Sequence, residues 1–225
     1  MKDLITIGLP SKGRLKDKAI SFFNDKGLKI LQSEKERNYF GTIENEPNIK
    51  IIFLHAKEII QRLGDGTLDI GVSGLDLLKE SDKNLQNKIN VQKKLDFGNA
   101  NLVVAVPNDW IDVQTIADIE EVSFDIRSKR NSRLRVATKY PNLTNEFLIS
   151  KGVTQYKLIP SLGATETYPF IGSSEIITDI TSTGKTLADN SLRVLKDGLI
   201  LSSNACLFIA KKKAAKLQPF LKSFV

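Results

Sequence analysis

The sequence predicts an α/β protein built from two lobes. Short apolar, strand-like runs alternate with helix-like runs along most of the chain, which is the pattern of largely parallel sheets covered by helices. The alternation breaks near residues 91–106, where two extended runs follow each other without a helix between them. The length of 225 residues suits two lobes of roughly 100 residues each.

The first lobe is expected to begin with three strands, each followed by a helix. Each predicted strand is a short apolar run that ends in glycine, proline or polar residues. The strands are predicted at residues 5–10, 50–54 and 69–74. The helices are predicted at about 15–24, 56–63 and 75–80, and the turn Gly64-Asp65-Gly66 ends the second of them.

The chain is expected to pass between the lobes twice. The extended runs 91–95 and 102–106 flank the segment 97–101, where we place the first crossing, and residues 193–202 form an extended return. The predicted first lobe therefore comprises residues 1–98 plus 192–225, and the second comprises residues 99–191.

The second lobe is expected to repeat the strand and helix alternation. Strands are predicted at 133–138, 156–160 and 175–180, and helices at 115–119, 142–151 and from Thr183. A last basic helix is predicted at 210–220. Two α/β lobes joined by two crossing strands resemble the periplasmic-binding-protein architecture of type II. Its ligand is expected in the cleft between the lobes, beyond the carboxyl ends of strands.

The charge of the chain favours a small anionic partner. The formal net charge is +7 and the pI is near 9.3, which suits an anion. The cations are spread along the chain and cluster only at 127–135 and 211–213, so small phosphorylated substrates are favoured and no nucleic acid is expected.

Single copies of two residue types exclude several kinds of site. Cys206 is the only cysteine and His55 the only histidine, which excludes an intrachain disulfide, a thiolate metal cluster and a multi-histidine zinc site. Cys206 lies in an apolar run and is expected to be buried. The first apolar run is too short for a signal peptide, and no segment approaches a membrane span of about 20 residues. A cytoplasmic protein without a membrane partner is expected.

The most informative stretch is "EIITDITSTGKTL", which starts at Glu175. Its Gly184-Lys185-Thr186 matches the end of a Walker phosphate loop, but Asp179 stands where that loop needs its first glycine. A helix capped by one hydroxyl is the structural alternative, and this stretch has four hydroxyls after the acid. The stretch instead resembles the phosphoribosyl-diphosphate (PRPP) loop of phosphoribosyltransferases. That resemblance assigns the 5′-phosphate to six consecutive residues: Thr181, Ser182, Thr183, Gly184, Lys185 and Thr186.

Four further segments place polar residues after predicted strands. They are 8–15 (GLPSKGRL), 69–76 (DIGVSGLD), 134–144 (LRVATKYPNLT) and 163–170 (GATETYPF). Taken singly, each has an ordinary structural explanation: a capped helix, a tight packing corner, a solvated loop lysine and a first-turn helix acid.

Together and in this order, the five segments resemble the catalytic core of the ATP phosphoribosyltransferase family, from about Leu4 to Leu207. The resemblance implies Mg²⁺-dependent condensation of ATP with PRPP, which gives N1-(5-phosphoribosyl)-ATP and diphosphate in the first step of histidine biosynthesis. The length resembles that of the short form of the family. The short form implies a catalytic homodimer and a regulatory subunit that resembles histidyl-tRNA synthetase.

The resemblance also implies roles for individual residues. Lys12, with His55 or Lys57, would face the diphosphate, whereas Glu166 and Asp179 would face the ribose hydroxyls or the metal. No dedicated protein site is expected for Mg²⁺, which PRPP would carry with help from Asp179 or Glu166. The candidates for ATP and cleft contacts are Arg14, Arg37, Ser73, Gly74, Asp76 and Lys139.

The chain departs from the family pattern after its second strand. Many members carry an arginine near the diphosphate at that place, and this chain has His55-Ala56-Lys57-Glu58. Imidazole is a weaker fixed cation than guanidinium, so His55, Lys57 and Arg37 all stay open as the replacement. Asn101 stands where a basic residue is often found. A solute-binding protein of the same architecture is the main alternative function.

Overall fold

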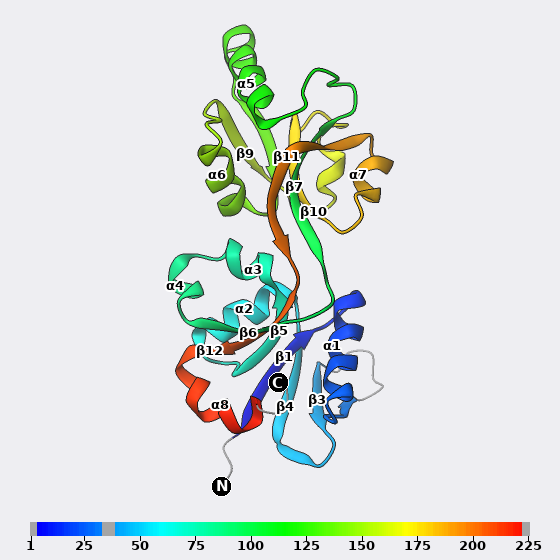
Figure 1. The fold of residues 1–225 in the computed structure, drawn as a ribbon, viewed down its shortest axis with the longest axis vertical. Coiled ribbons are helices and arrows are strands. Elements are labelled where there is room, and N and C mark those ends of the chain that lie inside the picture. Colours follow the sequence, from blue (N-terminus) through cyan, green and yellow to red (C-terminus); the bar gives the residue numbers. More distant parts are fainter. Residues whose placement is uncertain (1–3, 33–38, 222–225) are drawn as a thin grey trace. The chain divides into compact units, whose positions relative to one another are not determined.

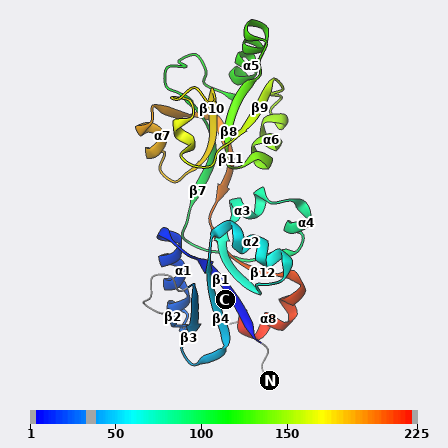
Figure 2. The same ribbon diagram turned by 180° about the vertical axis from the view of Figure 1, so that it is seen from behind.

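The computed structural model describes residues 4–32 and 39–221, and these form two compact α/β units. Unit 1 comprises Met1–Gly98 with Asn204–Val225, and unit 2 comprises Asn99–Ser203. Each unit contains one sheet, which can be followed in Figure 1 and from behind in Figure 2. Within the described residues, no helix combines the length and the apolar character that crossing a membrane requires.

The sheet of unit 1 has seven strands with a parallel centre. In spatial order the strands are β2 (Ile30–Gln32), β3 (Phe40–Ile43), β4 (Glu46–Leu54), β1 (Ile5–Pro10), β5 (Ile70–Gly74), β12 (Ala205–Ala210) and β6 (Ile89–Lys94). β1 pairs in parallel with β4 and β5, and the other pairs are antiparallel. The carboxyl ends of β4, β1 and β5 therefore meet at one edge of the sheet.

Helices cover both faces of this sheet. They are α1 (Gly13–Asp25), α2 (Ala56–Asp65), α3 (Leu75–Glu80), α4 (Lys83–Gln86) and, after the 3₁₀ turn Lys211–Lys213, α8 (Ala214–Leu221). One core packs around Phe23 and Phe53, and another around Ile59 and Phe208. Gly8 allows the second core to form, because a Cβ there would lie 2.4 Å from Leu68 Cδ1.

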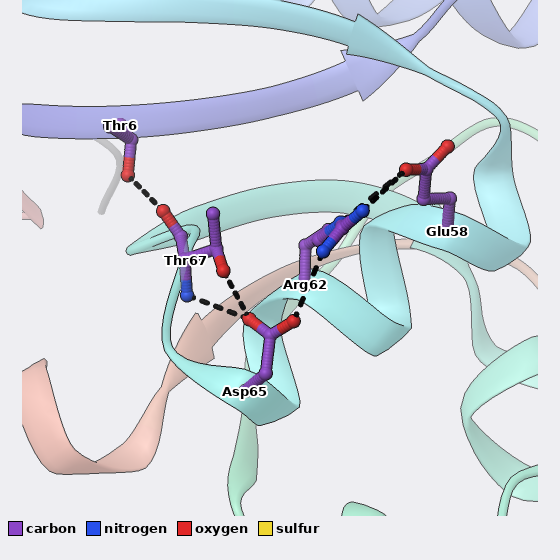
Figure 3. A network of polar contacts seen from close by, with 5 residues as sticks. All are labelled: Thr6, Glu58, Arg62, Asp65 and Thr67. Atoms are coloured by element: carbon purple, nitrogen blue, oxygen red, sulfur yellow. Dashed lines mark hydrogen bonds and ion pairs between the residues drawn. The ribbon is translucent and has the colours of Figure 1, made fainter.

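A polar network closes the connection from α2 to β5, as Figure 3 shows. Arg62 pairs with Glu58 and Asp65 on the last turns of α2, and Asp65 Oδ1 accepts the Thr67 backbone N–H at 2.8 Å. Thr6 Oγ1 then donates to the Thr67 carbonyl at 3.0 Å, which ties the connection to β1. Gly66, with φ of 82°, ends the helix as the sequence predicts.

The sheet of unit 2 has five strands. In spatial order they are β11 (Leu192–Ser203), β7 (Ala100–Pro107), β10 (Ile176–Thr181), β8 (Leu134–Thr138) and β9 (Tyr156–Pro160). β8 is parallel to both β9 and β10, whereas β7 is antiparallel to β10 and β11. The helical elements are α5 (Ile116–Arg130), α6 (Pro141–Ser150), the 3₁₀ turn Thr165–Thr167 and α7 (Lys185–Asp189). Both faces of the sheet carry buried apolar side chains.

Several elements differ from the sequence prediction. α5 extends to Arg130 instead of ending near residue 119, and its start is fixed by a capping box between Thr115 and Asp118. The antiparallel pair β2–β3 was not predicted. The strand β12 is also an addition, and it buries Cys206 completely, as expected for that side chain.

The second crossing between the units lies between Ser203 and Asn204, whereas the sequence placed the boundary at residues 191 and 192. The reason is strand pairing, because β11 pairs with β7 from Leu192 opposite Pro107 to Ser203 opposite Ala100. The whole of β11 therefore belongs to unit 2. The first crossing follows Gly98, at the position that the sequence indicates.

An ion pair joins the parallel strands β8 and β10 at their amino ends. Arg135 Nη2 lies 2.6 Å from Glu175 Oε1, and the Arg135 backbone N–H donates to Glu175 Oε2 at 2.7 Å. Burial raises the pKa of Glu175, but the hydrogen bonds and charge of Arg135 outweigh it, so the net pKa lies below the ordinary value of 4.5. A carboxylate with a lowered pKa stabilises the fold above its unfolded pKa, and this stabilisation is lost as the pH falls through the folded pKa.

We therefore expect Glu175→Gln to lower the free energy of unfolding by about 2 kcal/mol at neutral pH. The difference from wild type should shrink as the pH falls below about 4.5, where the carboxyl of the unfolded chain takes up its proton, and should be lost once the pH has fallen through the lowered pKa of folded Glu175. Urea unfolding of both proteins between pH 3 and 7, in steps of about one pH unit, measures the difference in the free energy of unfolding. Glu121→Gln on the exposed side of α5 is the control. If the free energy of unfolding of Glu175→Gln is lower than that of wild type by the same amount at every pH, the ionised Glu175 carboxylate is not the stabilising group.

Candidate active site

Three candidate segments of unit 1 follow adjacent parallel strands and meet at one sheet edge. Pro10 of β1 lies opposite Leu54 of β4, and the Ser11 backbone N–H donates to the Leu54 carbonyl at 2.8 Å. Gly8 lies opposite Gly71, so β5 ends beside the same edge. The segments after β1, β4 and β5 therefore lie side by side, as sites at the carboxyl ends of parallel strands do.

Lys12 and Arg14 are exposed at the start of α1. Lys12 is the residue before the helix, in an extended conformation with φ of −154°, and Gly13 follows with φ of 73°. Arg14 lines a cavity of about 650 Å³ that α1 forms with residues 93–97. Both cations are accessible to an anion at this end of α1.

His55 and Lys57 begin α2 and differ in what their side chains do. His55 Nδ1 accepts the Lys57 backbone N–H at 3.3 Å and so caps the helix. The Lys57 side chain is exposed and makes no hydrogen bond or ion pair to any residue that the structure describes. The capping contact therefore distinguishes the two candidate cations, because His55 uses Nδ1 to cap α2 whereas the Lys57 side chain has no such structural contact.

Ser73 at the end of β5 and Asp76 at the start of α3 are buried. Ser73 is fully buried and its hydroxyl donates to the Ala56 carbonyl at 2.8 Å, so it holds the start of α2. Asp76 is 6% exposed, and a Cβ on Gly74 would lie 2.3 Å from Asp76 Oδ1. Gly74 therefore makes room for this carboxylate. Arg37, the remaining candidate of this unit, lies outside the described residues.

The predicted phosphate loop of unit 2 connects β10 to α7. Thr181 Oγ1 accepts the Gly184 backbone N–H at 2.9 Å, and Thr183 Oγ1 accepts from Lys185 N at 3.4 Å. Gly184 has φ of 74°, a conformation that L side chains rarely adopt. The side chains of Ser182, Thr183, Lys185 and Thr186 are exposed. The loop thus forms a folded turn that presents hydroxyls and an ammonium group to solvent.

Asp179 lies on β10 two residues before this loop and is 9% exposed. Burial raises its pKa, and the nearby Glu166 raises it further, whereas the backbone N–H of Ile180, the charge of Lys139 and a hydrogen bond from Thr165 lower it. The net pKa lies above the ordinary aspartate value. The structure therefore brings together three residues that the sequence proposes: Asp179, Glu166 and Lys139.

The fit of a metal ion depends on these two acids. Among the described residues, no group of three or more His, Cys, Asp or Glu side chains could hold a metal ion. Asp179 and Glu166 are close enough to interact electrostatically, and carboxylate oxygens suit Mg²⁺. The two carboxylates could therefore add one or two ligands to a magnesium ion whose other ligands come from a bound substrate or water.

Unit 2 contains a cavity of about 690 Å³ that lies away from this loop. Its lining includes Pro107 at the end of β7, Arg135 at the start of β8 and Leu192 at the start of β11. Because β7 is antiparallel to β10, the end of β7 and the start of β11 lie level with the amino ends of β8 and β10. The phosphate loop, in contrast, follows the carboxyl end of β10. The cavity and the predicted site are therefore at opposite edges of the sheet.

Sequence reasoning assigned no role to several buried hydroxyls around Asp179. Thr165 is fully buried, bonds to Asp179 and lies 2.9 Å from Ser161 Oγ. Thr138, Thr144 and Thr178 form a second buried cluster. For Thr138 and Thr178, a threonine in a predicted strand is the signal in the sequence, but the partners of all these residues become visible only in the folded structure.

The chain matches a family model over three quarters of its length. Residues 55–224 match the model described as "HisG: ATP phosphoribosyltransferase". An ATP phosphoribosyltransferase of Rhizobium etli is 45% identical over 222 residues, which cover 98% of this chain and 96% of that protein. One of Brucella melitensis is 46% identical over 209 residues, covering 92% and 90%.

Solved structures share the fold. The ATP phosphoribosyl transferase (HisG:HisZ) complex from Thermotoga maritima contains a chain with a TM-score of 0.74 and 24% identity, covering 98% of this chain and 96% of that one. A substrate binding protein of an amino acid ABC transporter has a TM-score of 0.52 and 14% identity, covering 98% and 91%. These likenesses support the type II periplasmic-binding-protein-like fold. With the family model and the relatives of about 45% identity, the chain belongs to the ATP phosphoribosyltransferase family, pentosyltransferases of histidine biosynthesis.

Proposed function

We propose that the chain transfers the 5-phosphoribosyl group of PRPP to N1 of ATP, which gives N1-(5-phosphoribosyl)-ATP and diphosphate. The observation that carries this proposal is the turn Thr181–Thr186, with exposed hydroxyls directly after the buried Asp179. A sugar phosphate needs this combination, because hydroxyl and N–H donors bind the phosphate while a carboxylate accepts from ribose hydroxyls.

Unit 2 would bind the phosphoribosyl part of PRPP. Thr181 closes the turn through Gly184 N, which leaves Ser182, Thr183 and Thr186 to donate to the 5′-phosphate, with Lys185 as a charge. Asp179 and Glu166 would accept from the ribose hydroxyls. Lys139 offsets part of the negative charge that the two carboxylates bring together.

Unit 1 would supply cations for the leaving diphosphate. In the reaction the lone pair of adenine N1 bonds to the anomeric carbon, and the diphosphate leaves with the electrons of the broken carbon–oxygen bond. Fixed cations at the diphosphate stabilise the charge that develops there. Lys12 and Lys57 are exposed at the same sheet edge, and Lys57 is preferred to His55 because the His55 imidazole already caps α2. Arg14 is a further candidate, for ATP.

Magnesium would enter as the complex with PRPP. When bound, it neutralises diphosphate charge and so makes the diphosphate a better leaving group. Asp179 or Glu166 would assist through an oxygen atom, in agreement with the fit of this pair to an oxygen-preferring ion.

The chain is proposed to act in the cytoplasm as a catalytic homodimer together with a second, regulatory subunit. The length of this chain agrees with the short form of the family. The related Thermotoga maritima chain belongs to a HisG:HisZ complex, which supports a partner of a second kind. The partner expected here resembles histidyl-tRNA synthetase.

The direct test is product formation by the purified chain with ATP, PRPP and Mg²⁺, followed by absorbance and verified by mass spectrometry. Phosphoribosyl-ATP should accumulate with one diphosphate per product, and omission of PRPP is the control. The assay is run with and without the partner subunit. Binding of substrates without product in both arms would instead favour a solute-binding role.

The phosphate loop predicts a selective loss of PRPP affinity. The double variant Thr183→Val and Thr186→Val should raise the KM for PRPP by about 100-fold to 10,000-fold, because two hydrogen bonds to a charged group are lost and each is worth about 1.5–3 kcal/mol. The KM for ATP should change much less. Thr42→Val, at an exposed threonine on β3, is the matched control. Unchanged PRPP kinetics in the double variant would refute the loop assignment.

The cap on α2 predicts which cation acts at the diphosphate. Lys57→Met removes the charge but keeps most of the side-chain volume, and it should lower kcat/KM for PRPP by about 10-fold to 100-fold. His55→Asn keeps a capping acceptor and should stay within about threefold of wild type. Steady-state kinetics of both variants measure this. The opposite order of effects would assign the diphosphate to His55.

A further inference from the structure

Three threonine hydroxyls form a closed, fully buried cluster in unit 2. Thr138 ends β8, Thr144 lies in α6 and Thr178 lies in β10, and each is 0–2% exposed. The oxygen–oxygen distances are 2.6 Å between Thr178 and Thr138, 2.7 Å between Thr144 and Thr178, and 3.1 Å between Thr138 and Thr144. All three sides of this triangle are hydrogen bonds, and we call the three hydroxyls the threonine ring.

The direction of the hydrogen bonds around the threonine ring follows from counting protons. Thr138 Oγ1 accepts the Tyr140 backbone N–H at 2.9 Å and the Thr178 hydroxyl, so both of its lone pairs are used. Its own proton must then go to Thr144, and the Thr144 proton goes to Thr178. Each hydroxyl donates once, and none is left without an acceptor.

The ring lies directly behind two candidate site residues. Lys139 follows Thr138, and Asp179 follows Thr178 on the neighbouring strand, where Thr138 and Thr178 are opposite each other in register. The bond from Tyr140 N to Thr138 fixes the turn that carries Lys139, and Thr144 ties the first turn of α6 to β10. A shift of either strand would separate Lys139 from Asp179.

We propose that the threonine ring is a positioning element for PRPP binding, which holds the Lys139 turn and the Asp179 strand at a fixed separation. None of the three side chains is accessible to substrate, so the ring acts through its neighbours. The inference rests on the proposed function of Asp179 and Lys139. A positioning role can be distinguished from a purely structural role. Loss of the ring should change substrate kinetics more than does a substitution elsewhere that lowers the stability equally.

The test replaces Thr144, the ring member that is not adjacent in sequence to either site residue. Thr144→Val keeps the shape and removes the hydroxyl, and Thr144→Ser keeps the hydroxyl. Ser123→Ala is the matched control, because Ser123 is also fully buried in unit 2 and its hydroxyl bonds only within α5, to Glu120. The full chain is assayed with its partner subunit, and thermal unfolding is recorded for each variant.

Thr144→Val should lower kcat/KM for PRPP about tenfold, since small misplacements of binding groups have effects of this order. Thr144→Ser and Ser123→Ala should stay within about twofold of wild type, although Ser123→Ala melts at a lower temperature. The double variant Thr144→Val and Thr178→Val should resemble the single variants, because one break already opens the ring.

Two results would overturn the proposal. One is a Thr144→Val enzyme with wild-type PRPP kinetics, and the other is equal loss of activity in Thr144→Val, Thr144→Ser and Ser123→Ala. Failure of the proposed function is a separate result, because wild type itself would then form no phosphoribosyl-ATP.

Discussion

The parallel pairing of β8 with β10 is the constraint on which the candidate site of unit 2 depends. The register places Thr138 opposite Thr178, so Lys139, which follows the end of β8, and Asp179 on β10 come at the same level of neighbouring strands. A slip of one residue would turn every side chain of β10 to the other face of the sheet. The Arg135–Glu175 pair fixes this register at the amino ends of the strands, and the threonine ring fixes it at the carboxyl ends.

The buried charge of Asp179 is best explained by function. An aspartate whose pKa is raised by burial lowers the stability of the fold at pH values above its unfolded pKa, and Glu166 adds repulsion. Lys139 and Thr165 offset only part of this, because the net pKa stays above the ordinary value. Buried acids with a raised pKa cluster at binding and catalytic sites.

The elements near the site were predictable from local sequence, and their long-range partners were not. β1, β5 and β9 are apolar runs with clear ends, so the residues after β1 and β5 could be proposed for the site. β12 was missed because its six residues are all buried and show no alternation, and because it pairs with β5 and β6, from far earlier in the chain. The roles of Ser73 and the threonine ring likewise depend on partners 17 to 40 residues away in the sequence.

The candidate site of unit 2 divides its groups between a buried strand and exposed turns. A shared fold with a TM-score of 0.52 fixes the layers and the sheet edges but not the chemistry at those edges. Here Asp179 lies buried on β10, next to buried hydrogen-bonded hydroxyls, whereas the proposed phosphate donors and Lys12 lie on accessible turns. Group transfer needs both, because the ribose must be held still while the charge on the leaving diphosphate is met by groups that can reach it.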